Sequence, residues 1–178
     1  MPKIIAVILE LTVCICALWG IFFLMTFLHE LGHAIGYMIS TGGRRWHIRV
    51  GSGPRLLKTK MLTVKLLVFD GCFEPAEDKV DTRAKLVATL AGGPVVSLVL
   101  VIALLFLKFG GVSVNSAVFA ESAIEFFVSI ALFCNVFILI QSVIPAHYFC
   151  GEIKGMETDG RKIINAITAK NKNGDPEQ

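Results

Sequence analysis

The sequence predicts an α-helical polytopic membrane protein, with three transmembrane helices and a small membrane-associated β-sheet after the first helix. Hydrophobic residues make up 54% of the 178 residues and charged residues only 17%, whereas soluble domains average about 45–50% and about 25%. The apolar residues gather in three blocks, and about 20 such residues cross a bilayer as a helix. The segment between the first two blocks alternates apolar and polar residues between turn signals, a pattern typical of strands.

One domain is expected over residues 1–169, followed by a polar, disordered tail at 170–178. The net charge of +3 is mild and gives no reason to expect a nucleic-acid partner. The five cysteines form no C-x-x-C pair, and three of them lie in apolar runs. The sequence therefore predicts neither a disulfide framework nor a cysteine zinc site.

The first span is predicted at residues 4–39 and ends at Gly42-Gly43. Its apolar stretch is too long for the core of a signal peptide, so we interpret it as a permanent membrane anchor. At about 1.5 Å per residue this helix exceeds the thickness of the hydrocarbon layer, which places its last turns near one membrane face. Glu10 lies near the other end of the helix and is expected to reach the interface.

The β-region is predicted at residues 44–75, as two to four short strands at the membrane surface. Turns are expected at residues 51–54 and at Asp70-Gly71. Lys and Arg outnumber Asp and Glu over residues 42–85, which predicts a cytoplasmic location for this loop.

The second and third spans are predicted at residues 86–107 and 126–146. The small residues Gly92 and Gly93 open the second span and let another helix approach closely. In the third span, the amides of Asn135 and Gln141 either join helices or face a substrate. Beyond it, Thr158 or Asp159 is expected to cap a short amphipathic helix.

The chemistry is expected at His29, Glu30 and His33, which form an H-E-x-x-H pattern at the end of the first apolar block. Residues four apart lie on one face of a helix, so the two histidines can bind one metal ion. Zinc lowers the pKa of a bound water to about 7, and a neighbouring carboxylate can act as general base. Glu30 is the candidate for that role.

A third protein ligand is expected, because catalytic zinc usually has three. Cys150 is a softer option, and the oxygen and nitrogen candidates are His47, His147, Glu152, Glu157 and Asp159. Asp159 begins a helix and is followed by a glycine that permits close backbone approach, whereas His147 closely follows the third span. On the residues alone, Asp159 and His147 rank equally.

Four motifs follow one another along the chain: His29-Glu30-Leu31-Gly32-His33, Gly51-Ser52-Gly53-Pro54-Arg55-Leu56, Ala91-Gly92-Gly93-Pro94, and Pro145 followed by Asp159-Gly160. In this order they resemble the site-2 protease family of intramembrane zinc metalloproteases, over nearly the whole chain. The resemblance implies that His29, His33 and Asp159 bind one Zn²⁺ and that Glu30 activates water. It also points to Asn135 and Gln141 as candidate substrate-binding residues.

The chain departs from the family pattern at three places. Ser97 stands where the second-span motif commonly has Asn, and the third-span motif Asn-Leu-x-Pro reads as residues 141–145 here. The gap from Pro145 to Asp159 is longer than in the best-known members, and it contains His147 and Cys150 as competing ligands. No PDZ-like insert is present, so the chain looks like a minimal three-span core.

The expected function is zinc-dependent endoproteolysis within a membrane. The enzyme would cleave a single-span protein or a leftover signal segment near the cytoplasmic face. The expected partners are that substrate and the lipid bilayer, and the expected location is the cell membrane. A catalytically silent scaffold is the first alternative. A metal transporter or sensor is the second, although transporters place their ligands near the bilayer midplane.

Overall fold

The computed structural model describes residues 2–77, 79–110, 118–149 and 151–169. Its elements in chain order are α1 (Pro2–Thr41), β1 (Trp46–Lys58), β2 (Leu62–Pro75), α2 (Arg83–Phe109), α3 (Val118–Val143) and α4 (Asp159–Thr168). The fold is mostly helical with one small antiparallel sheet after the first helix, as predicted. The predicted disordered tail at 170–178 and the candidate ligand Cys150 lie outside the described residues.

The helices α1, α2 and α3 are each long and apolar enough to cross a membrane. Their qualifying segments are Lys3–Thr41, Arg83–Phe109 and Ala123–Val143, with mean hydropathies of 2.5, 2.6 and 2.4. α3 ends at Val143 rather than at residue 146 as predicted. The residue before a proline disfavours the helical conformation, so Pro145 stops the helix earlier than the apolar run does.

Two long strands form the sheet, with bends where turns were predicted. β1 and β2 pair antiparallel, and Ile48 of β1 has a register partner on either side, Phe73 and Leu62. Residues 51–54 lie inside β1, where Gly51 and Gly53 have φ values of +89° and +81° and the register shifts. Glycine adopts positive φ without steric cost, so the strand bends here without ending. Asp70-Gly71 likewise lies within β2.

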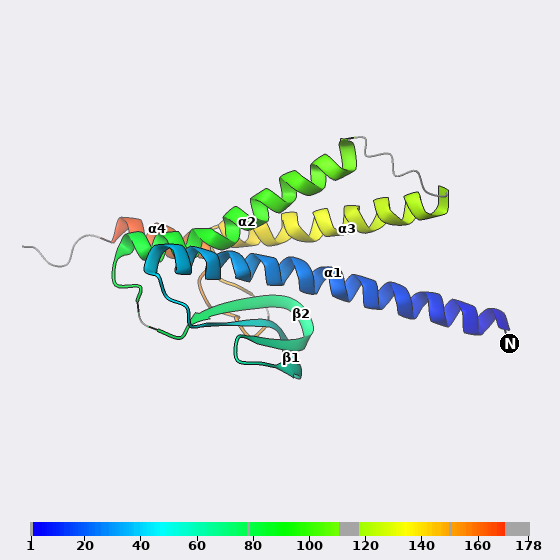
Figure 1. Cartoon of the computed structure of the whole chain (residues 1–178), viewed down its shortest axis with the longest axis horizontal. Coiled ribbons are helices and arrows are strands. Elements are labelled where there is room, and N and C mark those ends of the chain that lie inside the picture. Colours follow the sequence, from blue (N-terminus) through cyan, green and yellow to red (C-terminus); the bar gives the residue numbers. More distant parts are fainter. Residues whose placement is uncertain (1, 78, 111–117, 150, 170–178) are drawn as a thin grey trace, which may run out of the picture.

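α1 is the central element, with the sheet along one side and α2 and α3 on the other (Figure 1). The core beneath the sheet joins Ala34 of α1 to Ile48, Val50 and Val68. The indole Nε1–H of Trp19 also donates to the carbonyl oxygen of a β2 residue, Leu66, at 2.7 Å. The sheet therefore packs along the half of α1 that carries the H-E-x-x-H motif.

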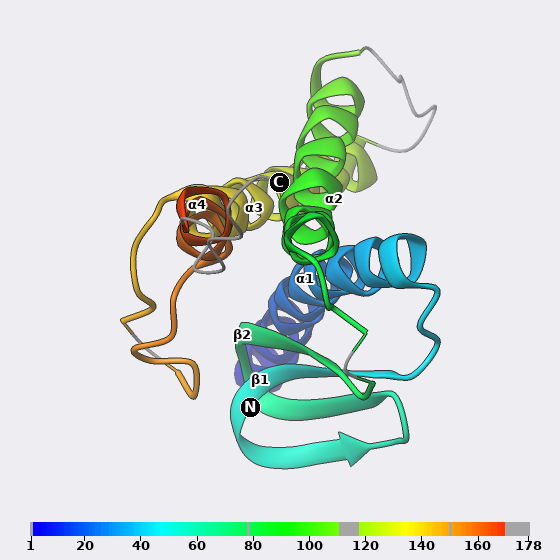
Figure 2. The same cartoon turned by 90° about the vertical axis from the view of Figure 1, so that its left-hand side faces the viewer.

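α2 packs across α1, and α4 packs against α2 and α3 (Figure 2). A Cβ added to Gly32 would lie 2.9 Å from the Cα of Gly93, closer than side chains tolerate. A Cβ on Gly160 would collide with the carbonyl of Val143 at the end of α3. The glycines of the Gly-Gly-Pro and Asp-Gly motifs thus allow four helices to meet at one end of the molecule.

Candidate metal centre

The two histidines of the motif are buried on one face of α1. His29 and His33 are each 5% exposed, and their Nε2 atoms lie 3.3 Å apart. This arrangement follows directly from the helix, because residues i and i+4 lie one above the other on the same face.

Asp159 completes the group from the other end of the chain. It is the first residue of α4, whose N-cap Thr158 accepts a hydrogen bond from the backbone N–H of Arg161. The Oδ2 atom of Asp159 lies 3.5 Å from Nε2 of His29 and 3.3 Å from Nε2 of His33. The capped start of a helix therefore points a carboxylate at the histidine pair.

Each ligand side chain is oriented by a hydrogen bond on its far side. Nδ1 of His29 lies 2.9 Å from the hydroxyl of Ser97, and the hydroxyl of Ser142 donates to Oδ2 of Asp159 at 2.8 Å. Nδ1 of His33 lies 2.9 Å from the carbonyl oxygen of Thr89. A carbonyl only accepts, so Nδ1 of His33 carries a proton, and Nε2 is the ring nitrogen that faces the centre.

This donor set fits a tetrahedral metal ion. Metal–ligand distances of about 2.0–2.1 Å in tetrahedral geometry separate the ligand atoms by about 3.4 Å, and the three distances here are 3.3, 3.3 and 3.5 Å. Nε2 of His33 also faces a carboxylate oxygen in a buried site, where a metal ion bound between them would compensate the buried negative charge. The buried group His29, His33 and Asp159 could therefore hold a metal ion.

The charge on Asp159 suits this role. Burial would raise the pKa of its carboxyl group, but hydrogen bonds from His29 and His33 outweigh it and hold the pKa well below its usual range. The carboxylate is therefore ionised at neutral pH and available as a ligand.

Glu30 lies beside this group and faces two small cavities. The larger, of about 70 Å³, has room for several water molecules. Its polar lining comes from Glu30, His33, Cys72, Tyr148, Asp159 and Lys162. The smaller, of about 30 Å³, is lined by Thr26, His29, Glu30, Asp70, Gln141 and Tyr148 among others. A carboxylate next to the ligand group and to water-sized space has the placement that a general base needs.

The sheet and the loop after α3 form the remaining walls of the larger cavity. A Cβ on Gly71 of β2 would meet the carboxylate of Glu30, so glycine is required for this close approach. Burial raises the pKa of the neighbouring Cys72 thiol. Burial, and then the charges of Asp159 and Glu30, raise the pKa of Tyr148 above its usual range, so its phenol is a hydrogen-bond donor at neutral pH.

The other predicted ligand candidates lie elsewhere. His147 is exposed and forms an isolated bridge with Glu157, which pairs with Arg161 of α4. His47 is bonded to Thr63 within the sheet, and Glu152 contacts Lys65. Within the described residues, Asp159 is the candidate that the structure brings to His29 and His33.

The two amides of α3 occupy different environments. Asn135 is fully buried and donates to the carbonyl oxygen of Ser97 at 2.8 Å, so it joins α3 to α2. This placement favours helix packing over substrate contact for Asn135. Gln141 lines the smaller cavity together with Glu30, so its predicted role in substrate binding stays open.

Ser142, Thr89 and Tyr148 were not singled out by the sequence, and Ser97 was noted only as a departure from the family pattern. Ser97 and Ser142 are hydroxyl residues inside apolar helices, a feature that calls for a hydrogen-bond partner. The sequence therefore already indicated that these two hydroxyls would have partners inside the protein. The contribution of Thr89 comes from its backbone carbonyl, which no residue pattern reveals.

Comparisons with protein-family models, with curated proteins and with solved structures give no match to this chain.

Proposed function

We propose that this chain is an intramembrane zinc metalloendopeptidase of the site-2 protease kind, with one Zn²⁺ per chain. The observation that carries the proposal is the triangle of buried ligand atoms from His29, His33 and Asp159, with Glu30 at its side, near the end of a long apolar helix.

Each residue has a defined task in peptide hydrolysis. His29, His33 and Asp159 would hold the zinc, which would polarise a carbonyl and lower the pKa of a water molecule. Glu30 removes a proton from the attacking water and returns it to the departing amine.

The three apolar helices support insertion in a membrane, and the cell membrane is the proposed location. Large apolar side chains on all three face outward, including Ile4, Phe106 and Phe133, which are 65%, 69% and 71% exposed. α1 has 40 residues and a length of about 60 Å, twice the hydrocarbon thickness of about 30 Å. The metal centre then lies near one face, and the basic excess over residues 42–85 assigns that face and the C-terminus to the cytoplasm.

The proposed substrate is a single-span membrane protein or a leftover signal segment. A peptide bond within a helix is shielded, so the segment must unwind before it is cleaved. An extended peptide can add to a sheet edge through backbone hydrogen bonds, and β2 places such a sheet next to Glu30. No nucleic acid is involved.

The test is a Glu30→Gln variant, with Glu10→Gln as the matched control because Glu10 lies exposed on the same helix. We expect Glu30→Gln to keep about one zinc per chain and to lose cleavage of membrane fragments by about 10²–10⁴-fold, while the control cleaves normally. Unchanged cleavage in Glu30→Gln would favour the scaffold alternative. Metal uptake into vesicles that His29→Ala abolishes would favour the transporter.

A further inference from the structure

The residues 146–149 and 151–158 between α3 and α4 close one side of the larger cavity, and they are called the loop below. The backbone N–H of Tyr148 donates to the carbonyl of Met156 at 2.9 Å, and that of Gly155 donates to the carbonyl of Tyr148 at 2.8 Å. The side chains of Tyr148, Ile153 and Met156 line the cavity next to Glu30. A peptide that approaches Glu30 from this side meets the loop first.

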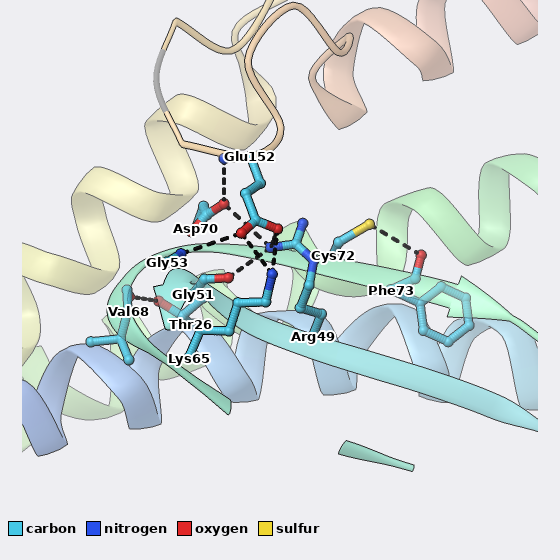
Figure 3. Close-up of polar contacts among 10 residues, drawn as sticks. All are labelled: Thr26, Arg49, Gly51, Gly53, Lys65, Val68, Asp70, Cys72, Phe73 and Glu152. Carbon is cyan, nitrogen blue, oxygen red and sulfur yellow. Dashed lines mark hydrogen bonds and ion pairs between the residues drawn. The ribbon is translucent and has the colours of Figure 1, made fainter. Parts of the chain in front are cut away.

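The carboxylate of Glu152 fastens this loop to the sheet (Figure 3). Both carboxylate oxygens lie 2.6 Å from Nζ of Lys65, and one accepts a hydrogen bond from the backbone N–H of Gly53 at 3.2 Å. Nη1 of Arg49 lies 3.6 Å from the other. Two cations and a backbone N–H thus converge on one carboxylate, as in protein sites that recognise carboxylate groups.

Asp70 binds the backbone of the loop at Glu152. Its Oδ2 accepts a hydrogen bond from the backbone N–H of Glu152 at 3.2 Å and lies 3.5 Å from Nη1 of Arg49. Gly151 has a φ of +73°, and a Cβ there would lie 2.8 Å from the same oxygen. Asp70 is 6% exposed and lies within β2, so its contact with Arg49 is made inside the sheet and does not depend on the loop.

The Glu152 side chain itself is accessible. It is 40% exposed, whereas those of Lys65 and Arg49 are 17% and 15% exposed. Exposed ion pairs add little stability because water competes for both charges. The two cations therefore lie largely buried in the sheet, while their carboxylate partner lies on a loop and is accessible to solvent.

We propose that Lys65, Arg49 and the Gly53 N–H form a carboxylate-binding subsite, occupied by Glu152 when the loop covers the cavity and by an acidic side chain of the incoming peptide when the loop lifts. Glu152 then acts as a displaceable latch, and the subsite selects peptides with an acidic residue near the cleaved bond. The substrate part of this inference rests on the proposed peptidase function.

The reactivity of Cys72 measures whether the loop is closed, because this cysteine lines the cavity that the loop covers. The measurement does not require the protein to be catalytically active. We expect Glu152→Gln to raise the rate of Cys72 alkylation by N-ethylmaleimide several-fold, measured by mass spectrometry of the peptide that contains Cys72. The control is Glu125→Gln, which removes the same charge from an exposed position of α3, away from the cavity. Lys65→Met should act like Glu152→Gln, and Lys65→Arg should restore slow alkylation.

Ligand exchange is tested on the wild-type chain with two soluble probes, acetyl-Ala-Ala-Glu-Ala-Ala-amide and its Gln counterpart. We expect the Glu probe to accelerate Cys72 alkylation more than the Gln probe, and Lys65→Met to remove the difference. Equal effects of the two probes, or slow alkylation in Glu152→Gln with an unchanged metal content, would overturn the proposal. Neither readout involves cleavage, so a failure of the peptidase function is seen separately, in the Glu30→Gln experiment.

Discussion

The candidate metal centre has two halves that are built in different ways. The first half, His29 and His33, lies on a single helix, and five consecutive residues suffice to describe it. The second half, Asp159, lies more than a hundred residues later, at the start of a ten-residue helix. It reaches the histidines only because α3 ends at Val143, a folded loop follows and α4 packs against that helix end.

The difference shows where the site is vulnerable. The histidine pair depends on the geometry of α1 alone, so it tolerates changes elsewhere in the chain. The position of Asp159 depends on contacts with the end of α3 and the residues after it: the hydroxyl of Ser142 donates to Asp159, and the hydroxyl of Thr158 contacts the carbonyls of Ile144 and Ala146. Substitutions that disturb the second half are therefore expected to weaken zinc binding by degrees. A substitution that fills the space between the ligands is expected to abolish zinc binding.

The largest effect is expected from Gly93→Ala, which attacks both halves at their meeting point. The new Cβ would lie 2.8 Å from Nε2 of His29 and would also collide with Nε2 of His33, so it would take the space in which the metal ion is held. Bound zinc per purified chain should fall close to zero. Gly20→Ala is the control, since a Cβ there meets nothing within 4 Å. Normal zinc content in Gly93→Ala would contradict the location of the centre.

Removing the third ligand is expected to have the next largest effect. Asp159→Ala leaves two histidines, and zinc affinity should drop by more than about 100-fold, because the loss of a direct ligand exceeds the effect of an orienting partner. The comparison variant is His147→Ala, which should bind zinc normally because His147 is exposed and lies outside the cluster. Competition with a zinc-chelating dye measures both affinities, and the opposite ranking would show that the third ligand is misassigned.

The orienting hydroxyls should have smaller effects, one for each half. Ser97→Ala removes the partner of His29, and Ser142→Ala removes the partner of Asp159. Each should weaken zinc binding by about 10–100-fold. We expect Ser142→Ala to be the more severe, because Asp159 lies at the first residue of the short helix α4, whereas His29 lies within the long helix α1. Equal zinc affinities for both variants and the wild-type chain would mean that packing alone orients the ligands.

The smallest effect is a pH dependence of the latch. The hydrogen bond from Lys65 is the main reason why the pKa of Glu152 lies below its ordinary value, which is about 4.3. The ion pair therefore stabilises the loop at pH values above the ordinary pKa, and this contribution is lost as pH falls through the lowered pKa. Hydrogen exchange over residues 151–158 should be faster in Lys65→Met than in the wild-type chain at pH 7, and the difference should vanish in strong acid.

The sequence was sufficient for the features that depend on short stretches of chain. Apolar runs predicted three long helices, and the structure has three that could cross a membrane. The polar residues Thr158 and Asp159 predicted a short capped helix, and α4 begins there with Thr158 as its N-cap. Helix formation and capping are decided by neighbouring residues, which is why these predictions were confirmed.

The predictions that failed concerned positions where distant segments compete with local preference. Residues 51–54 have the composition of a turn, but pairing with β2 keeps them within β1 as a bend. The apolar run of the third span continues to residue 146, but α3 ends at Val143. That end places Val143 against Gly160 and lets α4 pack there.

The sequence by itself determined the paired histidines, the adjacent carboxylate of Glu30 and the apolar helix that carries them, because helical spacing needs no other part of the chain. Only the tertiary structure decided between Asp159 and His147, which rank equally on the residues alone. The physical reason is that a third ligand is selected by distance, and distance across the chain is set by packing. Here the contacts of Gly32 with α2 and of Gly160 with α3 bring Asp159 to the histidines and leave His147 at the surface.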